Sequence, residues 1–337
     1  MPPCLPRGYR VAGVHCTIKT NPEKQDLSLI VSDLPATAAG VYTQNLVFAA
    51  PVGLDRKRTP SDAIRAVVVN SGNANACTGE RGERDAQQMA TWAAEACGAQ
   101  PEQALVLSTG IIGVFLPMEK IATGIKAATA QLASDEASLV AAARGMLTTD
   151  TTHKLAGRTL NFDGRTVHLT GMAKGAAMIG PRMATMLGLV LTDAAIAPAD
   201  AQRLLNATVE ESFNCISVDG HMSTNDTVLL LANGAAGGPP LSGAQLAEFG
   251  RALHELCVDL ARAIPIDGEG ATHLVTVEIS GAATVESARQ IAKTVAESLL
   301  VQTAIAGADP NWGRIVSAAG YAGVPFRPEL VGLRVNG

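Results

Sequence analysis

The chain has 337 residues, of which 47% are hydrophobic, 17% charged and 3% aromatic, and its formal net charge is -5 at pH 7. This composition excludes a disordered chain, and the acidic balance argues against nucleic acid as the main partner, because phosphate binding needs a basic surface. The N-terminus has no apolar run typical of a signal peptide, and no segment approaches the roughly 20 apolar residues of a membrane span, so we expect a cytoplasmic protein with no membrane partner.

Short apolar runs alternate with helical patterns along the chain. The apolar runs predict strands at 27–31, 66–69, 104–107, 227–232 and 274–280, and Asp163-Gly164 between two alternating runs predicts a hairpin over 159–170. The helical patterns predict helices at 84–97, 117–133, 137–147, 198–213, 244–264 and 285–296. Strands and helices come in clusters, which favours a layered α/β fold over a barrel.

The segment 171–188 reads GMAKGAAMIGPRMATMLG and is too rich in glycine for a good helix. A Gly-rich loop whose methionines fill gaps in the core is one interpretation. A phosphate loop is a second, although the GxxxxGK[ST] pattern is absent. The third is chemical: Thr185 becomes a nucleophile if the bond after Ala184 is cut, because its own α-amine then acts as the base.

Seven stretches of the chain resemble, in order, the ornithine acetyltransferase family, the bifunctional glutamate N-acetyltransferases of arginine biosynthesis. The cleavage segment of that family is similar to AKGAAMIGPRMATML. The other matching stretches are NSGNANACTG (70–79), STGIIG (108–113), TTDT (148–151), FNCISVD with STNDT (213–219 and 223–227), DGEGAT (267–272) and DPNWGR (309–314). The resemblance runs from about residue 8 to about residue 320 and favours the third interpretation.

The resemblance implies a role for several residues. Self-cleavage between Ala184 and Thr185 makes Thr185 the nucleophile that carries the acetyl group. Thr109 and Gly110 match the oxyanion-hole pair, which uses a hydroxyl and a backbone N–H to stabilise the negative oxygen.

The resemblance also implies substrate contacts. Lys174 binds the α-carboxylate of the substrate, Glu269 meets the side-chain amine of ornithine, and Thr148 is the contact that we choose within TTDT. Asp267 and Glu269 could form half of a metal site, but no His or second carboxylate pair has suitable spacing, so we expect no metal and no cofactor. The small-molecule partners are N-acetylornithine and glutamate, and some family members also accept acetyl-CoA.

At the level of the fold, the resemblance implies an αββα sandwich similar to the N-terminal-nucleophile fold. It implies two chains, 1–184 and 185–337, assembled as an α2β2 heterotetramer. The family continues for several tens of residues past the last residue of this sequence, so we expect a site that lacks its C-terminal segment. Two alternatives stay open: a related N-terminal-threonine amidohydrolase or aminopeptidase, and an inactive truncated remnant.

Overall fold

The computed structural model describes residues 3–180 and 186–336. The chain divides into two compact units, Met1–Glu269 and Gly270–Gly337, which are described separately. Every residue proposed for the site has a number of 269 or below and therefore belongs to the first unit.

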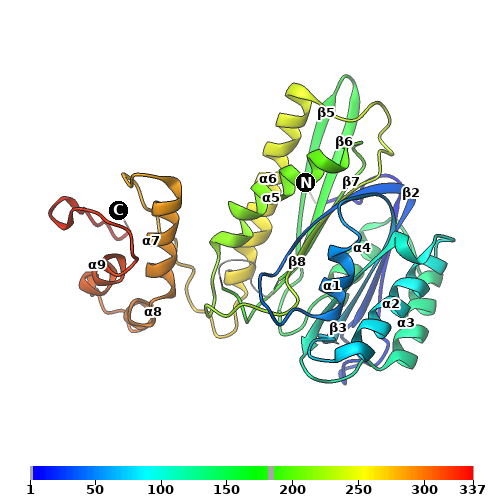
Figure 1. The fold of residues 1–337 in the computed structure, drawn as a ribbon, viewed down its shortest axis with the longest axis horizontal. Helices are drawn as coiled ribbons and strands as arrows, with labels where there is room; N and C mark the ends of the chain where they lie inside the picture. The colour runs from blue at the N-terminus through cyan, green and yellow to red at the C-terminus, as the bar shows by residue number, and fades with distance from the viewer. Residues whose placement is uncertain (1–2, 181–185, 337) are drawn as a thin grey trace. The chain divides into compact units, whose positions relative to one another are not determined.

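The described part of the first unit contains one sheet of eight strands, drawn in Figure 1. The strands follow the order β4-β3-β2-β8-β7-β6-β5, with β1 paired to β2. Their bounds are β1 Tyr9–Val14, β2 Leu27–Tyr42, β3 Ser61–Asn73, β4 Ala104–Ile111, β5 Lys154–Phe162, β6 Arg165–Lys174, β7 Leu187–Thr192 and β8 Thr227–Ala232.

The long strand β2 belongs to both halves of this sheet. Its first part pairs with β1 and β3, and its last part, from Thr37 to Tyr42, pairs with β8. Register shifts between Val31 and Ala38 separate the two parts, and such bulges bend a strand and increase its twist. The bend allows the two halves of the sheet to face each other.

Side chains that alternate along the strands confirm this packing. Val67 of β3 and Leu229 of β8 share one buried cluster between the two halves of the sheet, whereas their neighbours Val68 and Val228 point to two other clusters on the outer faces. The strands β7 and β8 are buried on both faces, which explains why they read as continuous apolar runs in the sequence.

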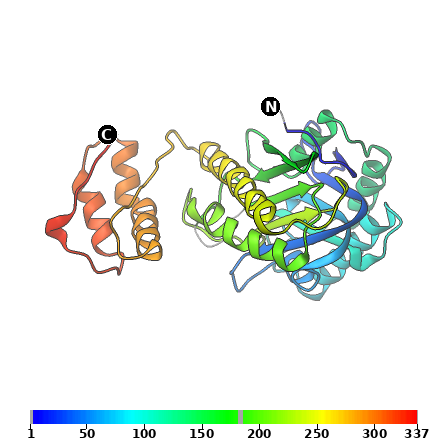
Figure 2. The same cartoon turned by 90° about the horizontal axis from the view of Figure 1, so that it is seen from above.

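Helices cover the two outer faces. The helices α2 and α3 pack on the half that contains β3 and β4, and α5 and α6 pack on the half that contains β5 to β8 (Figures 1 and 2). The layers are therefore helix, sheet, sheet and helix, which confirms the expected αββα sandwich. The helices are α1 Ala50–Arg56, α2 Gly79–Glu95, α3 Met118–Ala130, α4 Glu136–Gly145, α5 Pro198–Glu210 and α6 Gly243–Ile266, with short 3-10 turns at Pro101–Gln103 and Phe213–Cys215.

The second unit is helical in its described part. It contains α7 Val285–Glu297, α8 Leu299–Ala306, α9 Trp312–Gly320 and a 3-10 turn at Pro328–Leu330. The strand predicted at 274–280 is wrong: the segment forms no strand, and Leu274 and Val275 are 43% and 50% exposed. A strand needs a partner for its backbone groups, and within the described residues this apolar run has none.

The DPNWGR motif lies at the start of α9. Arg314 donates from Nη1 to the carbonyl of Leu300 at 2.8 Å and to the Thr303 hydroxyl at 3.1 Å, so it ties α9 to α8. The motif therefore has a structural role in the second unit.

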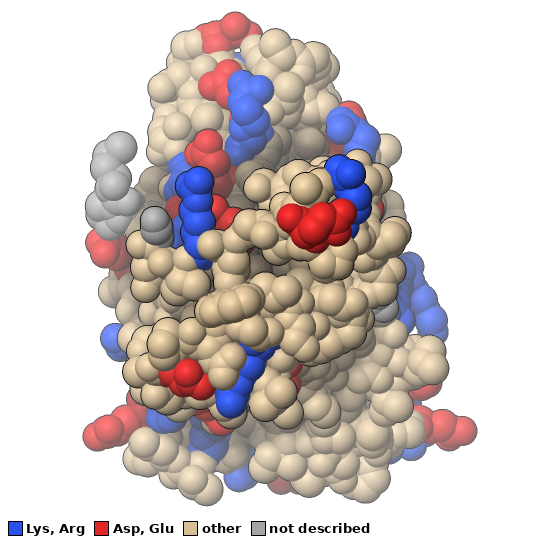
Figure 3. All heavy atoms as spheres, turned by 90° about the vertical axis from the view of Figure 1, so that its left-hand side faces the viewer, with Lys and Arg blue, Asp and Glu red and all other residues tan. Residues whose placement is uncertain are grey.

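The surface charges are mixed in sign. On the face drawn in Figure 3, basic and acidic side chains are scattered among wide areas of other residues. Among the described residues, no helix is long and apolar enough to cross a membrane.

Candidate active site

Residues 108–110 form the end of strand β4 and lie where the parallel strands β3 and β4 end together. Gly72 of β3 pairs with Gly110 of β4, and the buried Thr109 precedes the exposed Gly110. Gly110 has a φ of +134°, and a Cβ atom there would lie 2.3 Å from the carbonyl carbon of Gly72. Only glycine fits this position, so the close approach of the two strands explains the Gly in STG.

Buried amide side chains fix the position of residues 108–110 at the end of β4. Asn225 Nδ2 donates to the carbonyls of Ser108 at 2.8 Å and Ala74 at 2.7 Å. The Ser108 hydroxyl donates to Asn70 Oδ1 at 2.6 Å, and Asn70 Nδ2 donates to the carbonyl of Asn73 at 2.8 Å. The NSGNANACTG and STNDT motifs thus build the frame that fixes Thr109 and Gly110.

Lys174 ends strand β6 and is 1% exposed. Within the described part of the chain, its Nζ makes neither a hydrogen bond nor an ion pair, although Asp150 and Asp226 attract it electrostatically. Burial lowers the pKa of Lys174 against the attraction of these two carboxyl groups. A buried lysine without a close partner is rare and is typical of a binding or catalytic site.

A buried ion cluster lies beside Lys174. Lys154 Nζ contacts Asp150 Oδ1 and Asp267 Oδ2, each at 2.7 Å. Burial would raise the pKa of Asp150, but Lys174, Lys154 and the N–H of Gly175 outweigh it, so the pKa lies below the usual range. For Asp267, burial is outweighed by hydrogen bonds from Lys154 and Thr151, and its pKa is also lowered.

This ion cluster joins the loops that carry Thr148 and Glu269. Thr148 donates its N–H to Asp150 Oδ2 at 3.1 Å, and Asp150 Oδ1 accepts the N–H of Gly175 at 2.6 Å. Glu269 is exposed, and its N–H donates to the carbonyl of Ala176 at 2.8 Å. The structure therefore brings Thr148, Lys174 and Glu269 to one region.

Ala184 and Thr185 lie outside the described residues, but the chain is anchored on both sides of them. Before them, the carbonyl of Ile179 accepts the N–H groups of Val218, Asp219 and Gly220 at 2.8 to 3.1 Å. After them, the N–H of Met186 donates to Asp226 Oδ1 at 3.0 Å.

The 223–227 segment connects these parts of the site. Asn225 is hydrogen-bonded to Ser108 at the end of β4 and to Ala74. The adjacent Asp226 accepts the N–H of Met186 and lies near Lys174. Sequence reasoning assigned no role to Asn225, Asp226 or Lys154. The signal was present, because two polar side chains directly precede the apolar strand TVLLLA at the edge where other candidate residues also lie.

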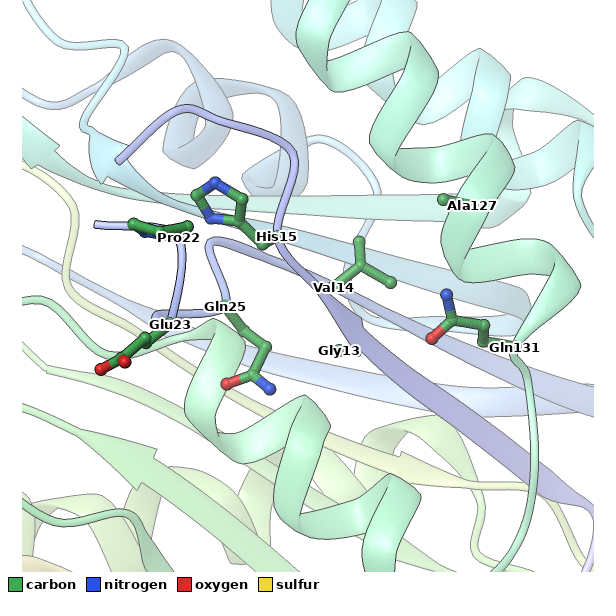
Figure 4. A pocket seen from close by; sticks show the side chains of 8 residues that line it. All are labelled: Gly13, Val14, His15, Pro22, Glu23, Gln25, Ala127 and Gln131. Carbon is green, nitrogen blue, oxygen red and sulfur yellow. The ribbon is translucent and has the colours of Figure 1, made fainter. Parts of the chain in front are cut away.

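A pocket lies elsewhere on the first unit, next to the end of β1 and to α3 (Figure 4). Its volume is about 280 Å³, and none of its lining residues belongs to the candidate site. The lining residues are Gly13, Val14, His15, Pro22, Glu23, Gln25, Ala127 and Gln131. Among the described residues, no group of three or more His, Cys, Asp or Glu side chains could hold a metal ion.

Known proteins match nearly the whole chain. A model of the ArgJ family matches residues 10–337. The arginine biosynthesis bifunctional protein ArgJ of Symbiobacterium thermophilum is 50% identical over 331 residues, which are 97% of this chain and 82% of that protein. The protein of the same name from Geobacter sulfurreducens is 50% identical over 325 residues, 96% of this chain and 82% of its own.

Solved structures give the same result for the fold. The crystal structure of the arginine biosynthesis bifunctional protein ArgJ from Bacillus halodurans is similar with a TM-score of 0.50 and 37% identity, over 54% of this chain and 92% of that chain. The PH0078 protein from Pyrococcus horikoshii has a TM-score of 0.52 at 12% identity, over 80% of this chain and 88% of that chain, and shares the fold alone.

Proposed function

This chain belongs to the ArgJ family, and we propose that it is the acetyltransferase that moves an acetyl group from N2-acetylornithine to glutamate in arginine biosynthesis. One observation carries the proposal at the level of the site. The 223–227 segment connects residues 108–110 at the end of β4, the buried Lys174 and the residue that follows Thr185. These are the parts that acyl transfer to an N-terminal threonine needs.

Maturation is the first step of the proposed mechanism. The Thr185 hydroxyl attacks the carbonyl of Ala184, and the bond from that carbonyl to the Thr185 nitrogen breaks, which leaves an ester and frees the α-amine of Thr185. Water then hydrolyses the ester, which releases the Ala184 carboxylate and restores the Thr185 hydroxyl. This amine has a pKa near 8 and can accept the proton of its own hydroxyl at working pH.

Turnover then proceeds by a ping-pong route. N2-acetylornithine gives its acetyl group to Thr185, with Thr109 and Gly110 donating to the oxyanion, and ornithine leaves. Glutamate enters the same site and takes the acetyl group from Thr185. Lys174 is suited to the α-carboxylate of either substrate, because its charge is buried and free of a close partner among the described residues.

Specificity is assigned to the two loops beside Lys174. Glu269, exposed at the end of the first unit, meets the side-chain amine of ornithine, and Thr148 contacts the bound amino acid. The proposed reaction needs no cofactor, and some members of the family also accept acetyl-CoA as an acetyl donor.

The proposed mature protein consists of the chains 1–184 and 185–337, assembled as α2β2 in the cytoplasm. The antiparallel pairing of β6 with β7 supports the continued association of the two chains of one protomer, because the strands on either side of the cut are hydrogen-bonded to each other. The match to a solved ArgJ chain over only 54% of this sequence, but 92% of that chain, also supports a protomer made of shorter chains.

The first test is the intact mass of the purified protein beside a Thr185→Ala variant. We expect two fragments that divide between Ala184 and Thr185, and one uncut chain in the variant. The cut protein should then transfer acetyl from N2-acetylornithine to glutamate. An uncut wild-type chain, or release of acetate without any acceptor at the same rate, would contradict the proposal.

A further inference from the structure

Asp226 has a carboxyl group that the mechanism above does not use. Its side chain is 0% exposed, and Oδ1 accepts the N–H of Met186 at 3.0 Å. Oδ2 is also buried and has no hydrogen-bond partner among the described residues. A buried carboxyl oxygen without a partner is costly, and in a native protein it calls for a functional reason.

The contact with Met186 limits the distance from this carboxyl group to the reacting residue. The nitrogen of Met186 is bonded to the carbonyl carbon of Thr185, and only three bonds separate it from the nitrogen of Thr185. Standard bond lengths keep these two nitrogens within about 4 Å of each other. Asp226 Oδ1, 3.0 Å from the Met186 nitrogen, therefore lies within about 7 Å of the nitrogen that must leave when the bond to Ala184 breaks.

The surroundings of Asp226 favour its acid form. Burial raises the pKa of Asp226 well above its usual range, against the opposing effects of Lys174, of the N–H groups of Met186 and Ser223, and of the Thr43 hydroxyl. Lys174, from β6, is the charged group that faces it among the described residues. Arg56, beyond the end of β2, donates a hydrogen bond from its guanidinium to the carbonyl of Thr43 and, in the described part of the chain, does not pair with Asp226.

We propose that Asp226 is the proton donor of self-cleavage and afterwards the counter-ion of the new N-terminus. The inference rests on the proposed cleavage between Ala184 and Thr185. Breaking an amide requires a proton on the leaving nitrogen, and a neutral carboxylic acid beside that nitrogen can supply it.

The proton transfers balance without any further reactant than water. A bond forms between Thr185 Oγ and the Ala184 carbonyl carbon, the bond from that carbon to the Thr185 nitrogen breaks, and Asp226 protonates the nitrogen. Asp226 regains a proton from the Thr185 hydroxyl as it becomes the ester. Water then hydrolyses the ester to the Ala184 carboxylic acid and the Thr185 hydroxyl. The α-amine takes the proton of that acid, and the ammonium stabilises Asp226 as a carboxylate, whose proton passes to solvent.

The test is a time course of cleavage in freshly translated protein, followed by intact mass. Asp226→Asn keeps an acceptor for the N–H of Met186 but cannot give a proton in this way, so we expect cleavage at least 100-fold slower than in wild type. Asp55→Asn is the matched control. Asp55 is also a buried carboxyl with a raised pKa that accepts one backbone N–H, from Val106, and its variant should cut within threefold of the wild-type rate.

A second readout concerns the protonation state and uses the uncut Thr185→Ala chain. A raised pKa means that the folded chain keeps a proton that the unfolded chain has already lost, so stability should fall as pH rises above about 4. Adding Asp226→Asn should remove the loss of stability that ionisation of Asp226 causes as pH rises. The Tm of the double variant should therefore rise relative to that of Thr185→Ala between pH 5 and pH 8.

Each outcome has one meaning. A wild-type chain that never cuts refutes the proposed function, and the donor role with it. Wild type and Asp226→Asn cutting at the same rate overturns only the inference, and so does an identical pH dependence of Tm in the two uncut chains. An Asp226→Asn chain that does not melt cooperatively would assign Asp226 a structural role and also overturn the inference.

Discussion

Gly110 is constrained by a positive φ and by its close contact with Gly72, and a comparison with Gly113 separates the two effects. Its φ is positive, and a Cβ atom would overlap the backbone of Gly72, whereas Gly113 has a positive φ of +82° with nothing within 4 Å of an added Cβ. We expect Gly110→Ala to lower the rate of self-cleavage and kcat by about 100-fold, the effect of losing an oxyanion donor. Gly113→Ala should show only a strain effect of about 1–3 kcal/mol in stability.

Intact mass and steady-state kinetics would check this prediction, with thermal melting to compare stability. If both alanine variants cut and turn over alike, the close contact between β3 and β4 does not position the oxyanion hole.

Lys174 and Lys154 are both buried lysines, but their surroundings predict opposite results. Lys154 makes two ion pairs at 2.7 Å, and replacing it by Met would leave two buried carboxylates unpaired, at a cost of about 3–5 kcal/mol in stability. Lys174→Met removes a buried charge that makes no such pair among the described residues, so the Tm should stay the same or rise. The KM for N2-acetylornithine should instead rise about tenfold or more, because a charge-assisted contact is lost.

Thermal melting beside kinetics on N2-acetylornithine separates the two roles. A large loss of stability in Lys174→Met with an unchanged KM would mean that Lys174 supports the fold and does not bind substrate.

The strand β8 carries a buried asparagine at each end, which gives a matched pair of variants. Asn225 precedes the strand and binds the carbonyls of Ala74 and Ser108, whereas Asn233 follows it and binds the carbonyl of Arg7 at 3.0 Å and the Ser32 hydroxyl at 3.3 Å. Each alanine variant should lose about 1–3 kcal/mol, since buried groups lose their partners. Only Asn225→Ala should also lower kcat, by about 100-fold, because residues 108–110 at the end of β4 would shift.

Comparison of kcat with the free energy of unfolding for the two variants checks this expectation. Equal losses of kcat would show that β8 supports activity through general stability alone.

Regular elements with a strong local pattern could be predicted from the sequence. The strand at 227–232 has the predicted bounds, and the hairpin through Asp163-Gly164 is present as β5 and β6. The strands β1 and β7 and the helices α1, α8 and α9 were not predicted. The strand β7, LGLVLT, lies at the end of the Gly-rich segment. Its burial depends on β6, which precedes the candidate loop, and on β8, which lies further along the chain.

The candidate residues named from motif resemblance lie in one region, but the residues that connect them were missed. Asn225 contacts Ser108, 117 positions away, and Asp226 contacts Met186, 40 positions away. No local pattern encodes such contacts. The ion cluster of Asp150, Lys154 and Asp267 likewise depends on a contact between Lys154 and Asp267, which are 113 positions apart. The strand wrongly predicted at 274–280 shows the same limit, since its apolar pattern does not specify a partner.

At the scale of the whole molecule, the division at residue 184 differs from the boundary between the compact units at residue 269. The proposed cut falls between β6 and β7 inside one sheet, so it divides the chain but not the hydrophobic core. Both halves of the active site therefore belong to the same folded unit before and after cleavage.

The carboxyl groups of Asp150 and Asp267 make the first unit sensitive to acid. Their pKa values are lowered, so the stability that they contribute is present above the usual Asp pKa of about 4 and is lost as pH falls through their lower folded values. We expect the Tm of wild type to fall steeply below about pH 4, and that of Lys154→Met to fall less, because its ion pairs are already absent. Melting curves between pH 3 and pH 7 would check this, and parallel curves would contradict it.

The bent strand β2 has a consequence for when the protein can mature. It pairs early in the sequence with β1 and β3, but its last part must wait for β8, about 190 residues further on. Contacts of such long range form late in folding. Asn225 and Asp226 directly precede β8, so the chain cannot assemble its cleavage machinery until both half-sheets have closed on each other. Cleavage would then occur only in chains that have completed folding, and because it is irreversible, each cut chain would be one that had folded.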